Sequence, residues 1–266
     1  MRSWRRRSRT STARAGRGTA CPRGRSRSCS RSRTASTPSP AASPRGLRPT
    51  GAKDPFALRR AAAGLARILI AREVAIDLPA WFAQAAALQP TPERPSPEEL
   101  YRFTVERLRA EALQDGIPPE VFQAVAAVAP PALPDFWRRL QALAAFLREP
   151  EAKVLILAGK RIRNILRKSG EEVLREPEPE RFAEPAERAL WEELRAIGER
   201  AERAAASGAY REALGVLARL AGPLERFFTE VLVLCEDAAL RRNRLALLSA
   251  AERPFRAIAD FVELPG

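Results

Sequence analysis

The chain has 266 residues, 45% of them hydrophobic, which is enough apolar material for the core of one large or two modest domains. Its formal net charge of +14 comes from residues 1–50, which hold 14 arginines and neither lysine nor acid, so residues 51–266 are formally neutral. The chain has no histidine, and this excludes the side chain that most often performs acid–base catalysis near neutral pH.

Residues 1–46 contain no Leu, Ile, Val or Phe, so they cannot bury enough apolar surface to offset the entropy of ordering. We expect this segment to be disordered. Three interpretations of it remain open. Alternating stretches such as Arg25-Ser26-Arg27-Ser28 fit an RNA-binding arm, and the Arg- and Ser-rich, acid-free composition fits an organellar transit peptide, although large aliphatic residues for an apolar face are missing. The abrupt change of character at residues 46–50 favours the third, a wrong-frame translation of a GC-rich gene.

Helix signals follow throughout the rest of the chain, and strand signals are almost absent. After an apolar segment at residues 76–88, the capping box at Ser96–Glu99 predicts a helix that runs to Gln114 and stops at Asp115-Gly116. Other helix starts are indicated by capping residues and prolines at Asp54-Pro55, Pro118-Pro119 and Asp135. The sequence therefore predicts an all-α fold, as one or more helical bundles preceded by the basic tail.

The best-defined amphipathic helix is predicted over residues 150–168. Its apolar residues recur at helical spacing and form one stripe, made of Leu155, Ala158, Ile162 and Ile165. The opposite side carries basic residues, namely Lys160, Arg163 and Arg167, with Arg161 and Lys168 one column over. Such a face is suited to phosphate contacts, whereas charge runs of this kind are usually solvated surface.

Residues 169–184 are polar, acidic and proline-bearing, which is typical of a linker. A long helix is predicted over residues 185–206, around Leu190, Leu194 and Ile197. Three more helices are expected at residues 209–220, 222–235 and 237–262, the last with a break at Pro254.

The last of these helices begins with an unusual run, Glu236-Asp237-Ala238-Ala239-Leu240-Arg241-Arg242-Asn243-Arg244-Leu245. Asp237 is the expected N-cap, and Arg241 lies four residues on, within pairing distance. On a helical wheel Asn243 and Arg244 share a column with leucines, so their polar groups must find partners. This favours a role in locking helices together over contact with RNA. Arg242 lies outside both apolar columns and is the better candidate for solvent and phosphate.

Catalytic chemistry has little support in this sequence. The carboxylates alternate with arginines at helical spacing, as in surface ion pairs, and no serine or cysteine has an adjacent base. Cys21, Cys29 and Cys235 indicate neither a disulfide framework nor a zinc site. We assign no catalytic residue, no metal ligand and no cofactor to the chain. No apolar stretch is long enough to span a bilayer, and a reducing, cytoplasmic location fits.

Five sequence blocks resemble the bacterial glycyl-tRNA synthetase β-subunit family, and their order and spacing make the resemblance specific. They are Pro49–Arg60, Phe103–Ile117, Ala158–Leu166, Phe227–Leu234 and Glu236–Asp260, the last containing a DALR-type anticodon-binding run. Gly159, Arg163, Leu232 and Leu234 depart from the residues usual in the family. The large amino-terminal portion of the family has no counterpart in residues 1–46, so we expect a carboxy-terminal fragment with a miscoded start.

The resemblance implies a helical body over residues 47–176 and a DALR-type anticodon-binding domain over residues 177–266. It implies a tRNA-binding portion of a glycine–tRNA ligase, with glycine tRNA and the adenylate-forming α subunit of an α2β2 assembly as partners. ATP and Mg²⁺ are implied for the assembled enzyme and not for this chain. The candidate tRNA-binding residues are Lys160, Arg161, Arg163, Arg167, Lys168, Arg241, Arg242, Asn243 and Arg244.

Two alternatives remain. The chain could be a structural helical bundle that only mediates subunit packing, or an RNA-binding protein whose Arg/Ser tail is genuine.

Overall fold

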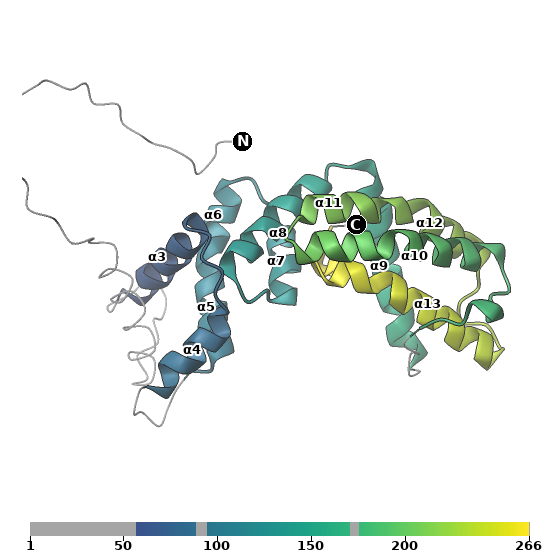
Figure 1. Cartoon of the computed structure of the whole chain (residues 1–266), viewed down its shortest axis with the longest axis horizontal. Helices are drawn as coiled ribbons and strands as arrows, with labels where there is room; N and C mark the ends of the chain where they lie inside the picture. The colour runs from purple at the N-terminus through teal and green to yellow at the C-terminus, as the bar shows by residue number, and fades with distance from the viewer. Residues whose placement is uncertain (1–56, 89–94, 171–175, 266) are drawn as a thin grey trace, which may run out of the picture. The chain divides into compact units, whose positions relative to one another are not determined.

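The computed structural model describes residues 57–88, 95–170 and 176–265. Helices are the only regular elements among these residues, so the all-α prediction is confirmed (Figure 1). The predictions for residues 1–46 and for a cap at Asp54-Pro55 lie outside the described residues. The chain divides into two compact units between Arg107 and Leu108. The domain boundary expected at residue 177 stays a prediction.

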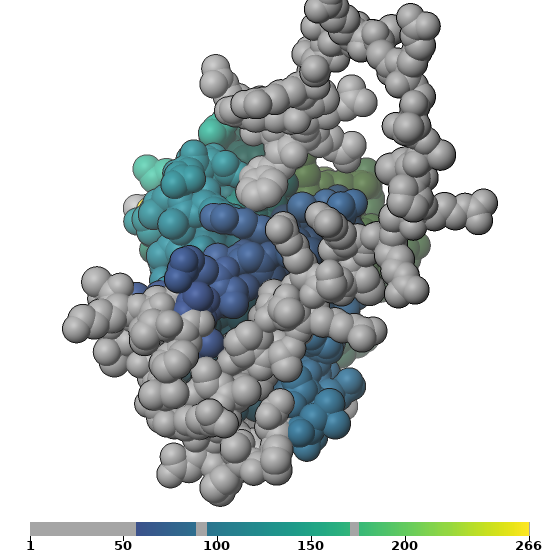
Figure 2. Space-filling model, turned by 90° about the vertical axis from the view of Figure 1, so that its left-hand side faces the viewer, coloured from purple at the N-terminus to yellow at the C-terminus, as the bar shows by residue number. Residues whose placement is uncertain are grey.

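The first unit contains α3 (Leu58–Ala71), α4 (Leu78–Ala87) and α5 (Pro97–Val105), and α5 packs against both of the others. Its described core contains Leu65, Leu69, Phe82 and Leu100, all buried. In Figure 2, α3 is drawn in purple-blue and α4 in blue.

The capping box predicted at Ser96 is present. The Ser96 hydroxyl accepts from the Glu99 amide at 3.1 Å, and the Glu99 carboxylate accepts from the Ser96 amide at 3.0 Å. The helix continues through a 3₁₀ turn, Glu106–Leu108, into α6 (Arg109–Gln114), which begins the second unit. Gly116, with φ of 77°, follows the end of α6, because glycine adopts this left-handed conformation without strain. The predicted start of the helix at Ser96 and its predicted end at Gln114 are therefore confirmed.

The second unit continues with α7 (Pro119–Val128), α8 (Leu133–Phe146) and α9 (Pro150–Ser169). The expected start of α8 at Asp135 is two residues late, because extended Ala132 precedes the helix and Pro134 lies in its first turn. Asp135 also lies in that first turn, where a carboxylate interacts favourably with the helix dipole.

The remaining helices are α10 (Pro185–Ala206), α11 (Tyr210–Leu217), α12 (Ala221–Glu230) and α13 (Ala238–Arg256). α10 packs against α11, α12 and α13, and α9 packs against α12 and α13. Leu190, Leu194 and Ile197 are buried, as the pattern of α10 predicts. We expected the helix to break at Pro254, but α13 continues for two more residues, to Arg256. Pro254 lies within α13, so near its end that the missing amide disturbs little of the helix.

Residues 222–235 do not form one helix as expected. α12 ends at Glu230, and Val231 is extended, with φ of −113° and ψ of 122°. Val231 and Val233 are buried, whereas Leu232 and Leu234 are 72% and 45% exposed. This alternation is that of extended chain, and β-branched valines favour it over helix.

Candidate nucleic-acid interface

α9 buries the apolar stripe that its sequence predicts. Leu155, Ala158 and Ile162 are buried, and Ile165 is half-buried. The helix begins with Pro150 at its first turn and ends at Gly170, which adopts φ of 60°. α9 packs on α12 and α13, and the side of the helix away from this stripe carries exposed residues.

The solvent side of α9 is cationic. Arg161, Arg167 and Lys168 are exposed, and Lys160 is half-buried. No acidic residue occurs from Ala152 to Gly170, and Glu151 in the first turn is the one acidic residue of α9. Arg167 donates to the Asn164 side-chain oxygen at 3.2 Å, which fixes its direction without neutralising it.

Arg163 differs from its neighbours, and its expected place on the solvent side of α9 is wrong. Its Nε donates to Glu252 at 2.6 Å, and its two Nη atoms donate to Asp260 at 3.3 and 3.4 Å. Burial lowers the pKa of Arg163, but the hydrogen bonds and charges of Glu252 and Asp260 outweigh it, so the pKa lies above its usual value. Arg163 therefore ties α9 to α13 and to the segment after it.

Arg161 contacts an aromatic side chain of the neighbouring helix. Its guanidinium carbon lies 4.4 Å from the centroid of the Phe228 ring of α12. The ring of Phe228 also meets that of buried Phe227 edge-on, at 5.6 Å between centroids. Sequence spacing did not predict this pair, because its members are on different helices.

The start of α13 is capped as predicted. An Asp237 carboxylate oxygen accepts from the amides of Leu240 at 3.0 Å and Ala239 at 2.8 Å. These two bonds, with weaker contributions from Arg181 and Arg241, lower the pKa of Asp237. Arg241 donates to the carbonyls of Cys235 at 2.7 Å and Glu236 at 3.3 Å, so it braces the segment before the helix.

Asn243 and Arg244 are buried and engaged inside the protein, as their wheel positions indicate. Asn243 exchanges two hydrogen bonds with the backbone of Glu178, at 2.7 and 2.9 Å. Arg244 donates to Glu187 and to the carbonyl of Leu232, both at 2.8 Å. These contacts support the interpretation that both residues lock helices together.

Glu187 is the partner that sequence reasoning missed. Its carboxylate also accepts from the amides of Ala183 at 2.8 Å and Glu184 at 2.6 Å, which caps the start of α10. The signal for it was the spacing from Glu184 to Glu187 around a proline at the first helical position.

Arg242 is exposed, as predicted, and its Nε donates to the carbonyl of Ala238 at 3.2 Å within the same helix. Exposed Leu232 and Leu234 belong to the short segment that precedes α13. The start of α13 therefore presents a cation and two apolar side chains to solvent.

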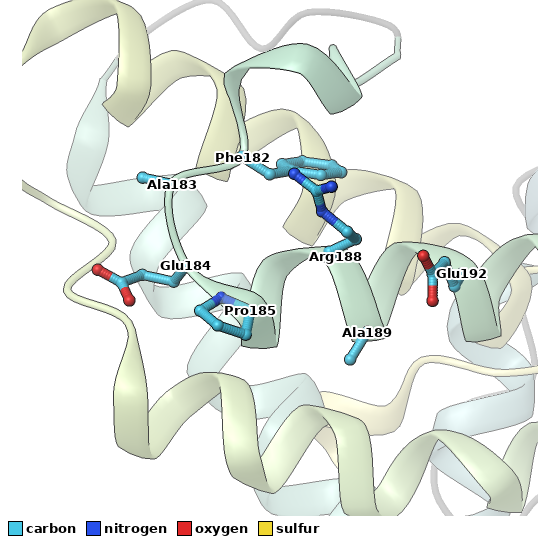
Figure 3. Close-up of a pocket in the computed structure, with 7 residues that line it drawn as sticks. All are labelled: Phe182, Ala183, Glu184, Pro185, Arg188, Ala189 and Glu192. Atoms are coloured by element: carbon cyan, nitrogen blue, oxygen red, sulfur yellow. The ribbon is translucent and has the colours of Figure 1, made fainter.

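A separate open hollow of about 290 Å³ lies at the start of α10 (Figure 3). Phe182 and the Arg188 side chain lie beside each other at one side of it, and Glu184 and Glu192 flank it. Because two carboxylates outnumber one guanidinium, this hollow is poorly suited to phosphate. In the part of the chain that the structure describes, no group of three or more His, Cys, Asp or Glu residues could hold a metal ion, and no helix is long and apolar enough to cross a membrane.

Comparison with known proteins decides the family. Residues 43–127 match the model of the glycyl-tRNA synthetase beta subunit, and residues 155–264, which contain most of α9 and all of α10 to α13, match that of the DALR anticodon binding domain. The glycine–tRNA ligase beta subunit of Pseudomonas aeruginosa is 40% identical over 219 residues, which is 81% of this chain. The chain belongs to the glycyl-tRNA synthetase β-subunit family.

Other β subunits show the same relationship. That of Ectopseudomonas mendocina is 41% identical over 217 residues, and that of Thiobacillus denitrificans is 40% identical over 220 residues. These alignments cover 81% and 82% of this chain, and 32% and 31% of the relatives. The chain therefore spans about a third of the length of the β subunits that it matches.

Proposed function

We propose that the chain binds the anticodon arm of glycine tRNA and thereby supports ATP-dependent charging by a glycine–tRNA ligase. Catalysis would belong to a partner α subunit in an α2β2 assembly, and the location would be the bacterial cytoplasm. Binding energy from the remote arm would help to position the reacting end of the tRNA. ATP and Mg²⁺ would be used by the assembled enzyme and not by this chain.

One observation carries this proposal. The solvent side of α9 holds Lys160, Arg161, Arg167 and Lys168 along a stretch of helix with no acidic residue, within the region that matches the anticodon-binding model. Lysine and arginine side chains along a helix can contact the phosphates of a folded RNA and supply salt-dependent affinity. Arg242 at the start of α13 would add a further contact.

Some of the candidate tRNA-binding residues make their contacts within the protein, so fewer residues remain for the proposed interface. Arg163, Asn243 and Arg244 are occupied by contacts within the protein, which supports a structural role for them. Arg241 braces the segment before α13 through two carbonyls. We therefore assign the phosphate contacts to Lys160, Arg161, Arg167, Lys168 and Arg242.

The test compares two triple variants of the full chain in which the arginines of residues 1–46 are replaced by serine. One carries Lys160→Gln, Arg167→Gln and Lys168→Gln. The matched control carries Arg188→Gln, Arg195→Gln and Arg211→Gln, three exposed arginines of α10 and α11, and so has the same net charge. Binding of glycine tRNA and of a non-cognate tRNA is measured at two salt concentrations.

We expect the α9 variant to lose roughly tenfold or more in affinity at low salt and to show a salt slope reduced by about 2–3. The control variant should keep both the affinity at low salt and the salt slope of the parent chain. Equal binding by the two variants would leave the structural bundle as the better account. Binding that disappears with the tail arginines alone would favour the Arg/Ser-tail alternative.

A further inference from the structure

The proposed interface contains one cation that differs from the rest. Arg161 is exposed on α9, yet its guanidinium lies over the ring of Phe228, 4.4 Å from the centroid. Phe228 is half-buried and is held by its edge-on contact with Phe227, which is fully buried in α12. The position of the guanidinium is thus set by a ring that is itself anchored in the core.

A guanidinium in this position is suited to more than phosphate. It is planar and weakly hydrated compared with an ammonium group, and a ring on one side leaves its other side to solvent. RNA-binding proteins recognise unstacked loop bases by stacking them on aromatic rings or arginine planes. Leu157, one helical turn before Arg161, is 49% exposed and extends the same side of α9 with apolar surface.

We infer that Arg161, held by Phe228, is a stacking platform for an unstacked base of a single-stranded RNA loop, and that Phe228 is its positioning residue. Exposed Arg167 and Lys168, further along α9, would then hold the phosphates beside that base. This inference rests on the proposed function and adds a base contact to a surface otherwise described by charge alone.

The test distinguishes the contribution of the planar guanidinium group to RNA binding from the contribution of its positive charge. In the full chain with tail arginines replaced by serine, Arg161→Lys keeps the charge and removes the plane, and Phe228→Leu removes the ring and keeps an apolar side chain. Arg195→Lys is the matched control, because Arg195 is exposed on α10 and lies outside the proposed interface. The probes are a fluorescein-labelled uridine octanucleotide and an abasic octanucleotide with the same backbone.

We expect Arg161→Lys and Phe228→Leu each to weaken binding of the uridine octamer about tenfold, with an unchanged salt slope. Binding of the abasic octamer should change less than twofold, and Arg195→Lys should leave the binding of both probes within twofold. Circular dichroism and thermal unfolding confirm that each variant is folded.

The inference is overturned if both variants bind the uridine octamer like the parent chain, or if they lose affinity equally for the abasic probe. The triple variant of α9 distinguishes this failure from a wider one. If that variant loses tRNA affinity while Arg161→Lys does not, the proposed function stands and only the stacking platform fails. If neither loses affinity, both are refuted.

Discussion

Arg244 and Glu187, 57 residues apart in the chain, form a buried ion pair that joins α13 to the capped start of α10. Their side chains are 5% and 0% exposed, and Arg244 also holds the carbonyl of Leu232. The pair therefore fixes the segment that carries exposed Leu232 and Leu234 at the proposed interface. The charge of Arg244 alone suggests an RNA contact, but its side chain instead holds the neighbouring surface segment in place.

Removing one member of this pair should be severe. Arg244→Met leaves the Glu187 carboxylate buried without its partner, and we expect a loss of about 3–5 kcal/mol in the free energy of unfolding. The exposed pair of Arg253 and Glu176 provides the control, because Arg253→Met should lose less than about 1 kcal/mol. Urea denaturation measures both. Similar losses for the two variants would show that the buried pair has no special role.

Arg163→Ala should separate stability from RNA binding. Because the Arg163 side chain is 31% exposed and tied to Glu252 and Asp260, we expect a loss of about 1 kcal/mol in stability. The salt slope of tRNA binding should stay as in the parent chain, whereas Arg167→Ala should reduce it by about 1. A reduced slope for Arg163→Ala would show that Arg163 leaves its internal partners to meet phosphate.

Tyr210 should make stability fall at high pH. Burial, followed by the hydrogen bond that its hydroxyl donates to Asp135, raises the pKa of Tyr210 to about 12. A raised pKa in the folded state gives stability that is fully present below the unfolded value near 10 and is lost as the pH rises toward 12. The urea midpoint of the parent chain should therefore fall more steeply between pH 10 and 12 than that of Tyr210→Phe. Parallel curves would contradict this assignment.

Asp237 should make stability fall at low pH. Hydrogen bonds from the amides of Leu240 and Ala239 lower its pKa, so its contribution is present above the unfolded value and is lost as the pH falls below about 4. Asp237→Asn keeps a capping side chain without the charge. The stability difference between the parent chain and this variant should shrink from pH 6 to pH 2.5. A constant difference would exclude the ionised cap.

Local signals were sufficient for much of the fold. The capping box at Ser96, the stripe of α9 and the N-cap at Asp237 depend on residues within a few positions of one another, and all three were predicted. The segment after α12 was not, because Val231–Leu234 continues an apolar run and only its exposure pattern in the fold shows extended chain.

The candidate site was predicted less completely, since its decisive partners are distant in sequence. Arg163 meets Glu252 and Asp260, 89 and 97 residues away, and no helical spacing reveals such partners. The Arg161–Phe228 contact likewise depends on how α9 packs on α12. The predicted solvent side of α9 was correct for the other cations, because burial of the apolar stripe determines which side of the helix faces solvent.

A cross-linking map tests most directly whether α9 and the start of α13 contact the anticodon loop. Glycine tRNA carrying 4-thiouridine in its anticodon loop is bound to the full chain and irradiated, and the cross-linked peptides are identified by mass spectrometry. We expect cross-links within residues 157–168 of α9 and 231–242 at the start of α13. Cross-links confined to residues 1–46, or to α10 and α11, would show that the anticodon loop binds elsewhere.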